Sequence, residues 1–144
     1  MLRRVNDSLY YLNEWRLPYP VYQFQTGDVD HDGQLDALVG VVKGTRFYPE
    51  KGRRLFMFKL VNGKVRPLWM GSKLGGKLVD FKWANGKVRS LEISGQQPAD
   101  RPTGRLPQMR YTVSEWQWND FGLQFHQYLI HQTDSLTAKR YYCQ

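Results

Sequence analysis

Residues 21–43 read VYQFQTGDVDHDGQLDALVGVVK, an acidic loop between two apolar stretches. The loop carries aspartates at its first, third, fifth and ninth positions and a glycine, Gly33, at its sixth. Alternate side chains of a tightly curled loop converge on one centre, and Gly33 permits the sharp turn that a Cβ would obstruct. The flanking apolar and β-branched residues are typical of strands. The segment therefore predicts a strand, a cation-binding loop and a second strand.

Calcium is the cation that this pattern favours, because it takes roughly six to eight oxygen ligands and tolerates irregular geometry. The predicted ligands are the side chains of Asp28, Asp30, Asp32 and Asp36 and the backbone carbonyl of Gln34. Without a cation, four carboxylates in one small volume would repel one another, and their pKa values would rise. The alternative interpretation is a solvated turn whose aspartates accept hydrogen bonds from the loop's own backbone.

The loop departs from the EF-hand pattern, in which helices flank the loop and a glutamate ends it at the twelfth position. Here the twelfth position is Val39, and both flanks have strand character. We therefore expect a strand-loop-strand site that Asp36 completes.

The strand pattern continues through the rest of the chain. About ten short extended segments are separated by turn residues, and no amphipathic pattern of helix length is visible. Aromatic residues make up 15% of the chain, and rings pack well on a pleated sheet. We predict an all-β fold, an antiparallel meander of about ten strands. The predicted strands cover residues 9–17, 21–26, 35–43, 55–61, 65–70, 78–84, 88–94, 109–118 and 121–130.

Three hairpins are expected from turn residues. Asn-Gly pairs occur at residues 62–63 and 85–86. Around Gly86, the apolar residues of the two strands share a face only if the loop has three residues, so we expect a three-residue loop with Gly86 left-handed. At Asn119-Asp120, a two-residue turn would pair Trp118 with Phe121.

The stretch from Gly27 to Gly40 resembles the FG-GAP/VCBS repeat of calcium-containing β-propellers, in which an acidic loop joins two strands of a blade. The match covers residues 21–43. This resemblance implies propeller-like blades and the ligands already named. The chain has one such acidic loop, and its length suits about three four-stranded blades, whereas a closed propeller needs at least about four. We therefore expect an incomplete or open propeller-like sheet, and a small β-barrel built from similar hairpins is the alternative.

The chain of 144 residues is expected to form a single all-β domain, residues 1–144, with the calcium loop at 28–36. The segment from Leu9 to Leu17 alternates its side chains as a strand does, and we expect it to join the sheet and cover an edge. Residues 95–107 are rich in proline and glycine and predict a long surface loop. Residues 131–144 show little periodicity and are expected to form a polar C-terminal arm.

The chain offers limited signals about its location. Its single cysteine, Cys143, excludes an intrachain disulfide. No apolar run approaches the ~20 residues of a membrane-spanning helix, and the first residues lack the apolar stretch of a signal peptide. The protein is therefore either cytoplasmic or a mature form whose signal has been removed. The resemblance favours an extracytoplasmic location, in the periplasm or at the cell surface, where calcium is abundant enough to fill weak loop sites.

Three classes of function are compatible with the sequence. The first is a calcium-stabilised binding or scaffold module of the cell envelope that recognises a glycan or a protein. The second is a nucleic-acid-binding β-domain, since the net charge is +8 and rings can stack on bases, although the basic residues are scattered in short clusters. The third is a carbohydrate-active hydrolase with a carboxylate pair, for example Glu92 and Glu115. No nucleophile triad, phosphate loop or zinc spacing is visible, and no feature indicates the oligomeric state.

Overall fold

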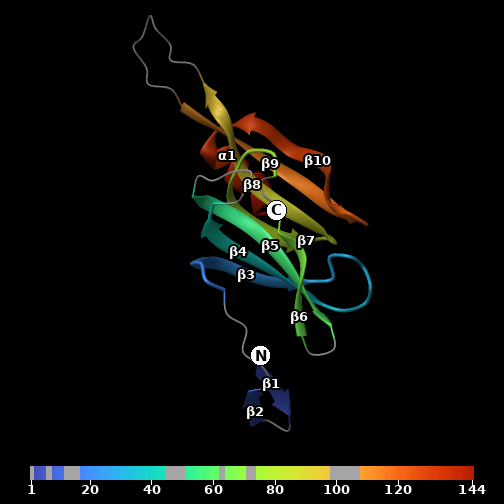
Figure 1. The fold of residues 1–144 in the computed structure, drawn as a ribbon. Coiled ribbons are helices and arrows are strands. Elements are labelled where there is room, and N and C mark those ends of the chain that lie inside the picture. The colour runs from blue at the N-terminus through green and yellow to red at the C-terminus, as the bar shows by residue number, and fades with distance from the viewer. Residues whose placement is uncertain are drawn as a thin grey trace, which may run out of the picture.

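The computed structural model describes residues 2–5, 8–11, 17–44, 51–61, 64–70, 74–97 and 108–144. It is an all-β structure with one short helix (Figure 1). The first four-stranded sheet contains β3 (Val21–Gly27), β4 (Asp36–Lys43), β5 (Gly52–Val61) and β6 (Lys64–Met70). The second contains β7 (Lys77–Ala84), β8 (Lys87–Gln97), β9 (Gln108–Asn119) and β10 (Gly122–Thr133).

Both sheets are antiparallel meanders, because each strand pairs with the next strand of the chain. The predicted all-β class and antiparallel pairing are confirmed. The alternative of a small barrel is wrong for the described residues, since neither sheet closes on itself. Each sheet ends in edge strands, β3 and β6 in the first and β7 and β10 in the second.

The main core lies between the two sheets. Its buried members come from the acidic loop and from strands of both sheets: Val29, Leu38, Leu55, Met57, Phe81 and Val88. Trp116 and Trp118 pack against this cluster. The acidic loop therefore contributes to the same core that joins the sheets.

Polar side chains of β3 join it to β7 across the boundary between the sheets. The side-chain amide of Gln25 donates to the Phe81 carbonyl at 3.2 Å and accepts from the Trp83 N–H at 2.8 Å. One position further along the same face, Gln23 donates to Asp80 at 3.3 Å. The Gln25 side-chain amide therefore satisfies one carbonyl and one N–H of β7, as a peptide group of a neighbouring strand would.

The outer face of the first sheet has its own apolar cluster. Val39, Val41, Phe56 and Phe58 are buried there, and Leu17 and Tyr19 pack on them. Successive residues of β5 therefore point into two different cores, so this strand is covered on both faces.

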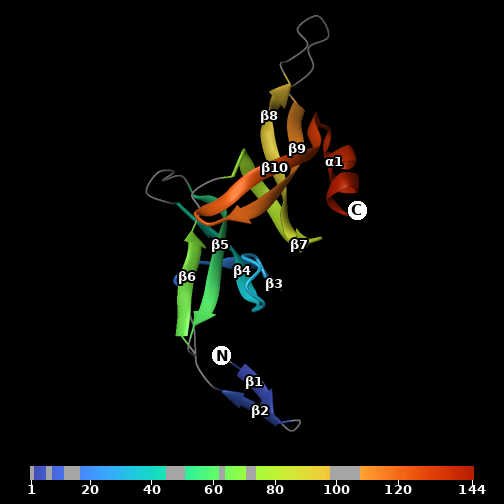
Figure 2. The same ribbon diagram turned by 90° about the vertical axis from the view of Figure 1, so that its right-hand side faces the viewer.

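The outer face of the second sheet is covered by helix α1 (Ser135–Tyr142) (Figure 2). Ala138 is buried against Leu91 and Val113. The Asp134 carboxylate caps the helix by accepting from the Thr137 N–H at 2.8 Å, and at the other end the guanidinium of Arg89 donates to the carbonyls of Tyr142 and Gln144.

The predicted C-terminal arm, residues 131–144, therefore differs from the structure. Residues 131–133 complete β10, and the polar residues that follow form a capped helix that buries one small side chain. None of the helical structure within the described residues has the length and apolar character needed to cross a membrane.

The predicted three-residue loop at Gly86 is wrong. Ala84 pairs with Lys87, so the turn has two residues, and Asn85 and Gly86 both have positive φ, at 53° and 75°. This is the geometry of a type I′ turn. The apolar residues do not need to share one face, because β7 has a register shift between Leu78 and Asp80 and α1 covers the second face.

The turn of the third hairpin lies one residue later than predicted, which moves the partner of each paired residue by two positions. Asn119 pairs with Gly122, so the turn residues are Asp120 and Phe121, and Trp118 pairs with Leu123. The Asn119 side chain stabilises this turn by accepting from the N–H groups of Phe121 and Gly122 at 2.9 and 3.0 Å. Phe121 is consequently 95% exposed rather than paired.

The N-terminal strand does not join either four-stranded sheet over its described residues. β1 (Leu2–Val5) and β2 (Ser8–Tyr11) form a separate two-stranded hairpin, which lies beyond the first sheet in both views (Figures 1 and 2). The expectation that the segment from Leu9 joins the sheet is wrong for residues 9–11, because these pair with β1. Residues 12–16, 98–107 and 62–63 lie outside the described residues, and with them most of the predicted surface loop and the first Asn-Gly turn.

Replacing Gln25 by Leu should destabilise the protein by about 1–3 kcal/mol, because the Phe81 carbonyl and the Trp83 N–H would lose their partners in a partly buried boundary. Urea denaturation would measure the free energy of unfolding. The control is Gln124→Leu on β10, which is exposed and makes one long hydrogen bond to Asn119. Equal stability of the two variants would contradict the role of Gln25.

Replacing Ala138 by Asp should destabilise the protein by at least about 2 kcal/mol, because a carboxylate would be forced between α1 and the second sheet. Leu136→Asp on the same helix is the control, since Leu136 is 64% exposed in the first turn, where an acid is favourable. Thermal unfolding of both variants distinguishes a packed helix from a free arm, for which the two changes would have equally small effects.

Candidate metal centre

The acidic loop connects β3 to β4 and is anchored at both ends. Gly27 pairs with Asp36 at the mouth of the loop, and Asp36 is only 1% exposed. Val29, inside the loop, is buried in the core between the sheets. The remaining loop residues, from His31 to Leu35, are exposed.

Hydrogen bonds from the backbone to the aspartates shape the loop. Asp28 accepts from the N–H groups of Asp32 and Gly33 at 3.0 and 2.9 Å. Asp36 accepts from the Val29 N–H at 3.0 Å, which closes the loop across its mouth. His31 and Gly33 have positive φ, at 57° and 88°, and this allows the chain to curl inward. These bonds are those expected of a self-capped turn, and they also aim the carboxylates toward one point.

Three of the four aspartates converge. Asp28, Asp30 and Asp36 each offer one carboxylate oxygen, and these oxygens lie within 4.8 Å of one another. Oδ1 of Asp30 and Oδ1 of Asp36 are buried and have no hydrogen-bond partner. Buried carboxylate oxygens that lack a hydrogen bond are costly unless a cation is near. The group could therefore hold a metal ion of the oxygen-seeking kind.

A lysine of the next strand lies at the same point. The ammonium of Lys59 on β5 is 2.6 Å from Oδ2 of Asp30 and 3.6 Å from Oδ1 of Asp36, and it also contacts Asp32. Its bonds to Asp30 and Asp32 raise the pKa of Lys59, and the bond from Lys59 lowers the pKa of Asp32 to about 2. Lys59 therefore supplies one positive charge to a loop that carries four aspartates.

Asp36 remains the least compensated of the acids. Burial raises the pKa of Asp36, and the neighbouring Asp30 carboxylate raises it further, while Lys59 opposes both effects. This is the direction expected for carboxylates crowded together in one volume. One ammonium does not fully offset the charge of the cluster.

The structure places the predicted ligands unequally. Asp28, Asp30 and Asp36 come together as expected, whereas Asp32 lies outside this group and contacts Lys59. Gln34 is exposed and donates its backbone N–H to Asp32 at 2.9 Å. Lys59 was not predicted. Ala37 opposes Phe58 at the end of the β4–β5 ladder, and this brings the neighbouring residues Asp36 and Lys59 close together.

The proposed catalytic carboxylates lie on opposite faces of the second sheet. Glu115 pairs with Arg89 on the face covered by α1, and Glu92 pairs with Thr112 on the other face. Glu92 and Glu115 therefore cannot act together across one glycosidic bond. This arrangement excludes Glu92 and Glu115, the example given for the hydrolase hypothesis, as a catalytic pair.

No protein-family model, curated protein or solved structure matches this chain. The similarity of the acidic loop to the FG-GAP/VCBS repeat therefore stays a prediction from the residues that carry it.

Replacing Lys59 by Met should strengthen calcium binding by about tenfold or more, because a bound calcium ion would no longer have to displace an ammonium from Asp30 and Asp36. In calcium-free buffer the same variant should be less stable than the wild type, since the carboxylates lose their positive neighbour. Isothermal titration calorimetry and thermal unfolding measure the two effects. Lys64→Met, an exposed lysine on β6, is the control. If Lys59→Met binds calcium no more tightly than the control, Lys59 does not compete with the ion.

Proposed function

We propose that this protein is a calcium-stabilised binding module. The observation that carries the proposal is the convergence of three carboxylate oxygens within 4.8 Å, together with the buried Oδ1 of Asp36 that lacks a hydrogen bond. Calcium is favoured over magnesium because the loop offers several carboxylates in an irregular arrangement, whereas magnesium demands a near-ideal octahedral shell. Asp28, Asp30 and Asp36 would hold the ion.

The ion would act on the fold rather than on a reaction. Asp36 opens β4, and Val29 between the ligands belongs to the core that joins the sheets. An ion held by Asp28, Asp30 and Asp36 would therefore fix the β3–β4 loop against that core. Any ligand that binds only the folded protein stabilises it in proportion to occupancy. The role that follows is structural support for a surface elsewhere on the sheets.

The arrangement of the sheets supports a propeller-like interpretation of the fold. Both are four-stranded meanders, and their first strands, β3 and β7, lie side by side and are joined through Gln25. Successive blades of a propeller are related in this way. Two such sheets make an open arrangement, which agrees with an incomplete propeller rather than a ring.

An extracytoplasmic location is part of the same proposal. A loop with three converging carboxylates and a competing lysine is expected to be a weak site. Weak sites fill where calcium is near millimolar concentration, as it is outside the cytoplasm. The module would then be loaded at the cell surface or in the periplasm and would recognise a glycan or a protein there.

Calcium at about 100 times its dissociation constant should stabilise the wild-type protein by roughly 2.7 kcal/mol, and a chelator should reverse this gain. Asp36→Asn keeps the shape of the side chain but removes the charge, so its unfolding should become insensitive to calcium. Asp120→Asn, on the exposed β9–β10 turn, should respond as the wild type does. Thermal unfolding with calcium, magnesium or chelator tests this, and an unchanged melting temperature of the wild type in all three would exclude a calcium-stabilised fold.

A further inference from the structure

A cavity of about 670 Å³ lies along the second sheet, on the face that also contributes to the core between the sheets. Its wall includes Glu92 and Ser94 of β8, Ser114 and Trp116 of β9, and Phe125 and Tyr128 of β10. Small-molecule sites in proteins commonly have volumes of roughly 300–1,000 Å³ and combine apolar walls with a few polar groups. We call this cavity the Glu92 pocket.

The floor of the Glu92 pocket is a buried carboxylate held by neutral donors. Glu92 is 2% exposed, and its Oε1 accepts from the backbone N–H groups of Gly75 and Gly76 at 2.7 and 2.9 Å. Its Oε2 accepts from the hydroxyls of Ser90 and Ser114 at the longer distances of 3.2 and 3.4 Å. Oε1 is therefore held by short hydrogen bonds, whereas the longer bonds to Oε2 can be replaced by a ligand hydroxyl that approaches more closely.

Further hydroxyls extend this polar floor. Thr112 donates to the hydroxyl of Ser94 at 2.7 Å and accepts from the Gln132 N–H at 3.1 Å. A hydroxyl has one donor and two acceptor sites, so Ser94 and Ser114 retain capacity for a ligand. The floor can thus both donate and accept hydrogen bonds.

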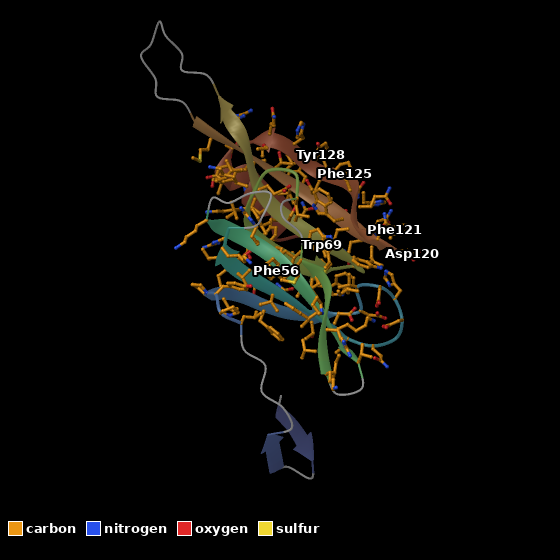
Figure 3. The ribbon with its side chains drawn as sticks, viewed as in Figure 1. Phe56, Trp69, Asp120, Phe121, Phe125 and Tyr128 are labelled. Atoms are coloured by element: carbon orange, nitrogen blue, oxygen red, sulfur yellow. The ribbon has the colours of Figure 1, made fainter. Side chains whose placement is uncertain are left out.

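Another part of the lining is a row of aromatic rings on β9 and β10. Phe125 lies 5.6 Å from Trp116 and 4.7 Å from Tyr128, and Tyr128 stacks on His131 at 4.3 Å, measured between ring centroids. Phe125 and Tyr128 are 42% and 51% exposed, and Figure 3 shows them side by side on β10. Part of each ring is therefore accessible to a ligand, although Tyr128 has one face against His131.

Irregular pairing of β10 produces this row. Phe125, Tyr128 and His131 are spaced by three residues, and in a regular strand neighbours at that spacing point to opposite faces. The pairing of β10 with β9 shifts between Phe125 and Gln127, and again between Tyr128 and Ile130. Bulges of this kind re-aim side chains, and here they bring the rings to the same side.

We infer that the Glu92 pocket binds a neutral sugar unit of a glycan. A sugar ring has an apolar C–H face that can lie on Phe125 or Tyr128 and a rim of hydroxyls that can bond to Glu92, Ser94 and Ser114. A purely apolar ligand would leave the spare hydrogen-bonding capacity of Ser94 and Ser114 unused, and an acidic group placed against the buried Glu92 carboxylate would be repelled by it. The inference deepens the proposed binding function and rests on it.

The experiment uses the full chain on an array of neutral oligosaccharides of glucose, mannose, xylose and N-acetylglucosamine, with and without calcium. Binding oligosaccharides are then titrated against three proteins: wild type, Tyr128→Ala and Phe24→Ala. Phe24 is 56% exposed on β3 and lies outside the pocket, so it is the matched control. Tyr128→Ala should weaken binding by about tenfold or more, whereas Phe24→Ala should bind as the wild type does. Glu92→Gln should weaken binding too, and circular dichroism establishes that each variant is folded.

Several results would overturn the inference. These are the absence of binding to every neutral oligosaccharide by the calcium-saturated protein, equal binding by Tyr128→Ala and wild type, and binding confined to acidic glycans. Binding of tetramethylammonium in the pocket, lost in Tyr128→Ala, without any sugar binding would assign the pocket to cations and also overturn it. Calcium stabilisation without sugar binding would remove only the sugar assignment. Sugar binding that depends on Tyr128 in a protein insensitive to calcium would support the pocket and remove the metal from the proposed function.

Discussion

The contact between the two meanders is the constraint on which the structure depends, and Gln25 is its polar centre. Its amide satisfies a carbonyl and an N–H of β7 that an isolated edge strand would leave open. Around it the approach is close, because a Cβ at Gly27 would lie 2.6 Å from the ring of Trp83. The common core and the position of the acidic loop both follow from sheets held in this alignment.

The strands could be predicted because their signals are local. Alternating side chains and turn residues located the eight strands of the two sheets to within a few residues. The features that were predicted wrongly, helix α1 and the Gly86 turn, depend on contacts between residues far apart in the sequence. Helix α1 presents only a short apolar face, made by Ala138, Tyr141 and Tyr142. Part of its support comes from Arg89, which is far away in the sequence. The Gly86 turn was misjudged because that helix, absent from the prediction, gives the second sheet another apolar face to cover.

The candidate sites divide in the same way. The aspartate spacing is a property of nine consecutive residues, so the convergence of Asp28, Asp30 and Asp36 could be predicted, while the ammonium of Lys59 arrives only through the pairing of β4 with β5. The Glu92 pocket could not be predicted from alternation, because shifts in the pairing of β10 change the side to which its rings point. The sequence alone therefore predicts the acidic loop, which is continuous in the chain. It does not predict the Glu92 pocket, whose lining comes from several strands.

The irregular course of β10 has a second consequence, for association between molecules. β10 pairs only with β9 among the described strands, so its other side is an open edge of twelve residues bearing exposed rings. An edge of this kind invites a strand of another molecule to extend the sheet, provided that its backbone donors and acceptors form an even row. Three shifts in pairing and the left-handed backbone of Gln132, at φ 52°, break that row. The irregular pairing that exposes the rings therefore also makes the edge of β10 a poor template for a strand of another molecule.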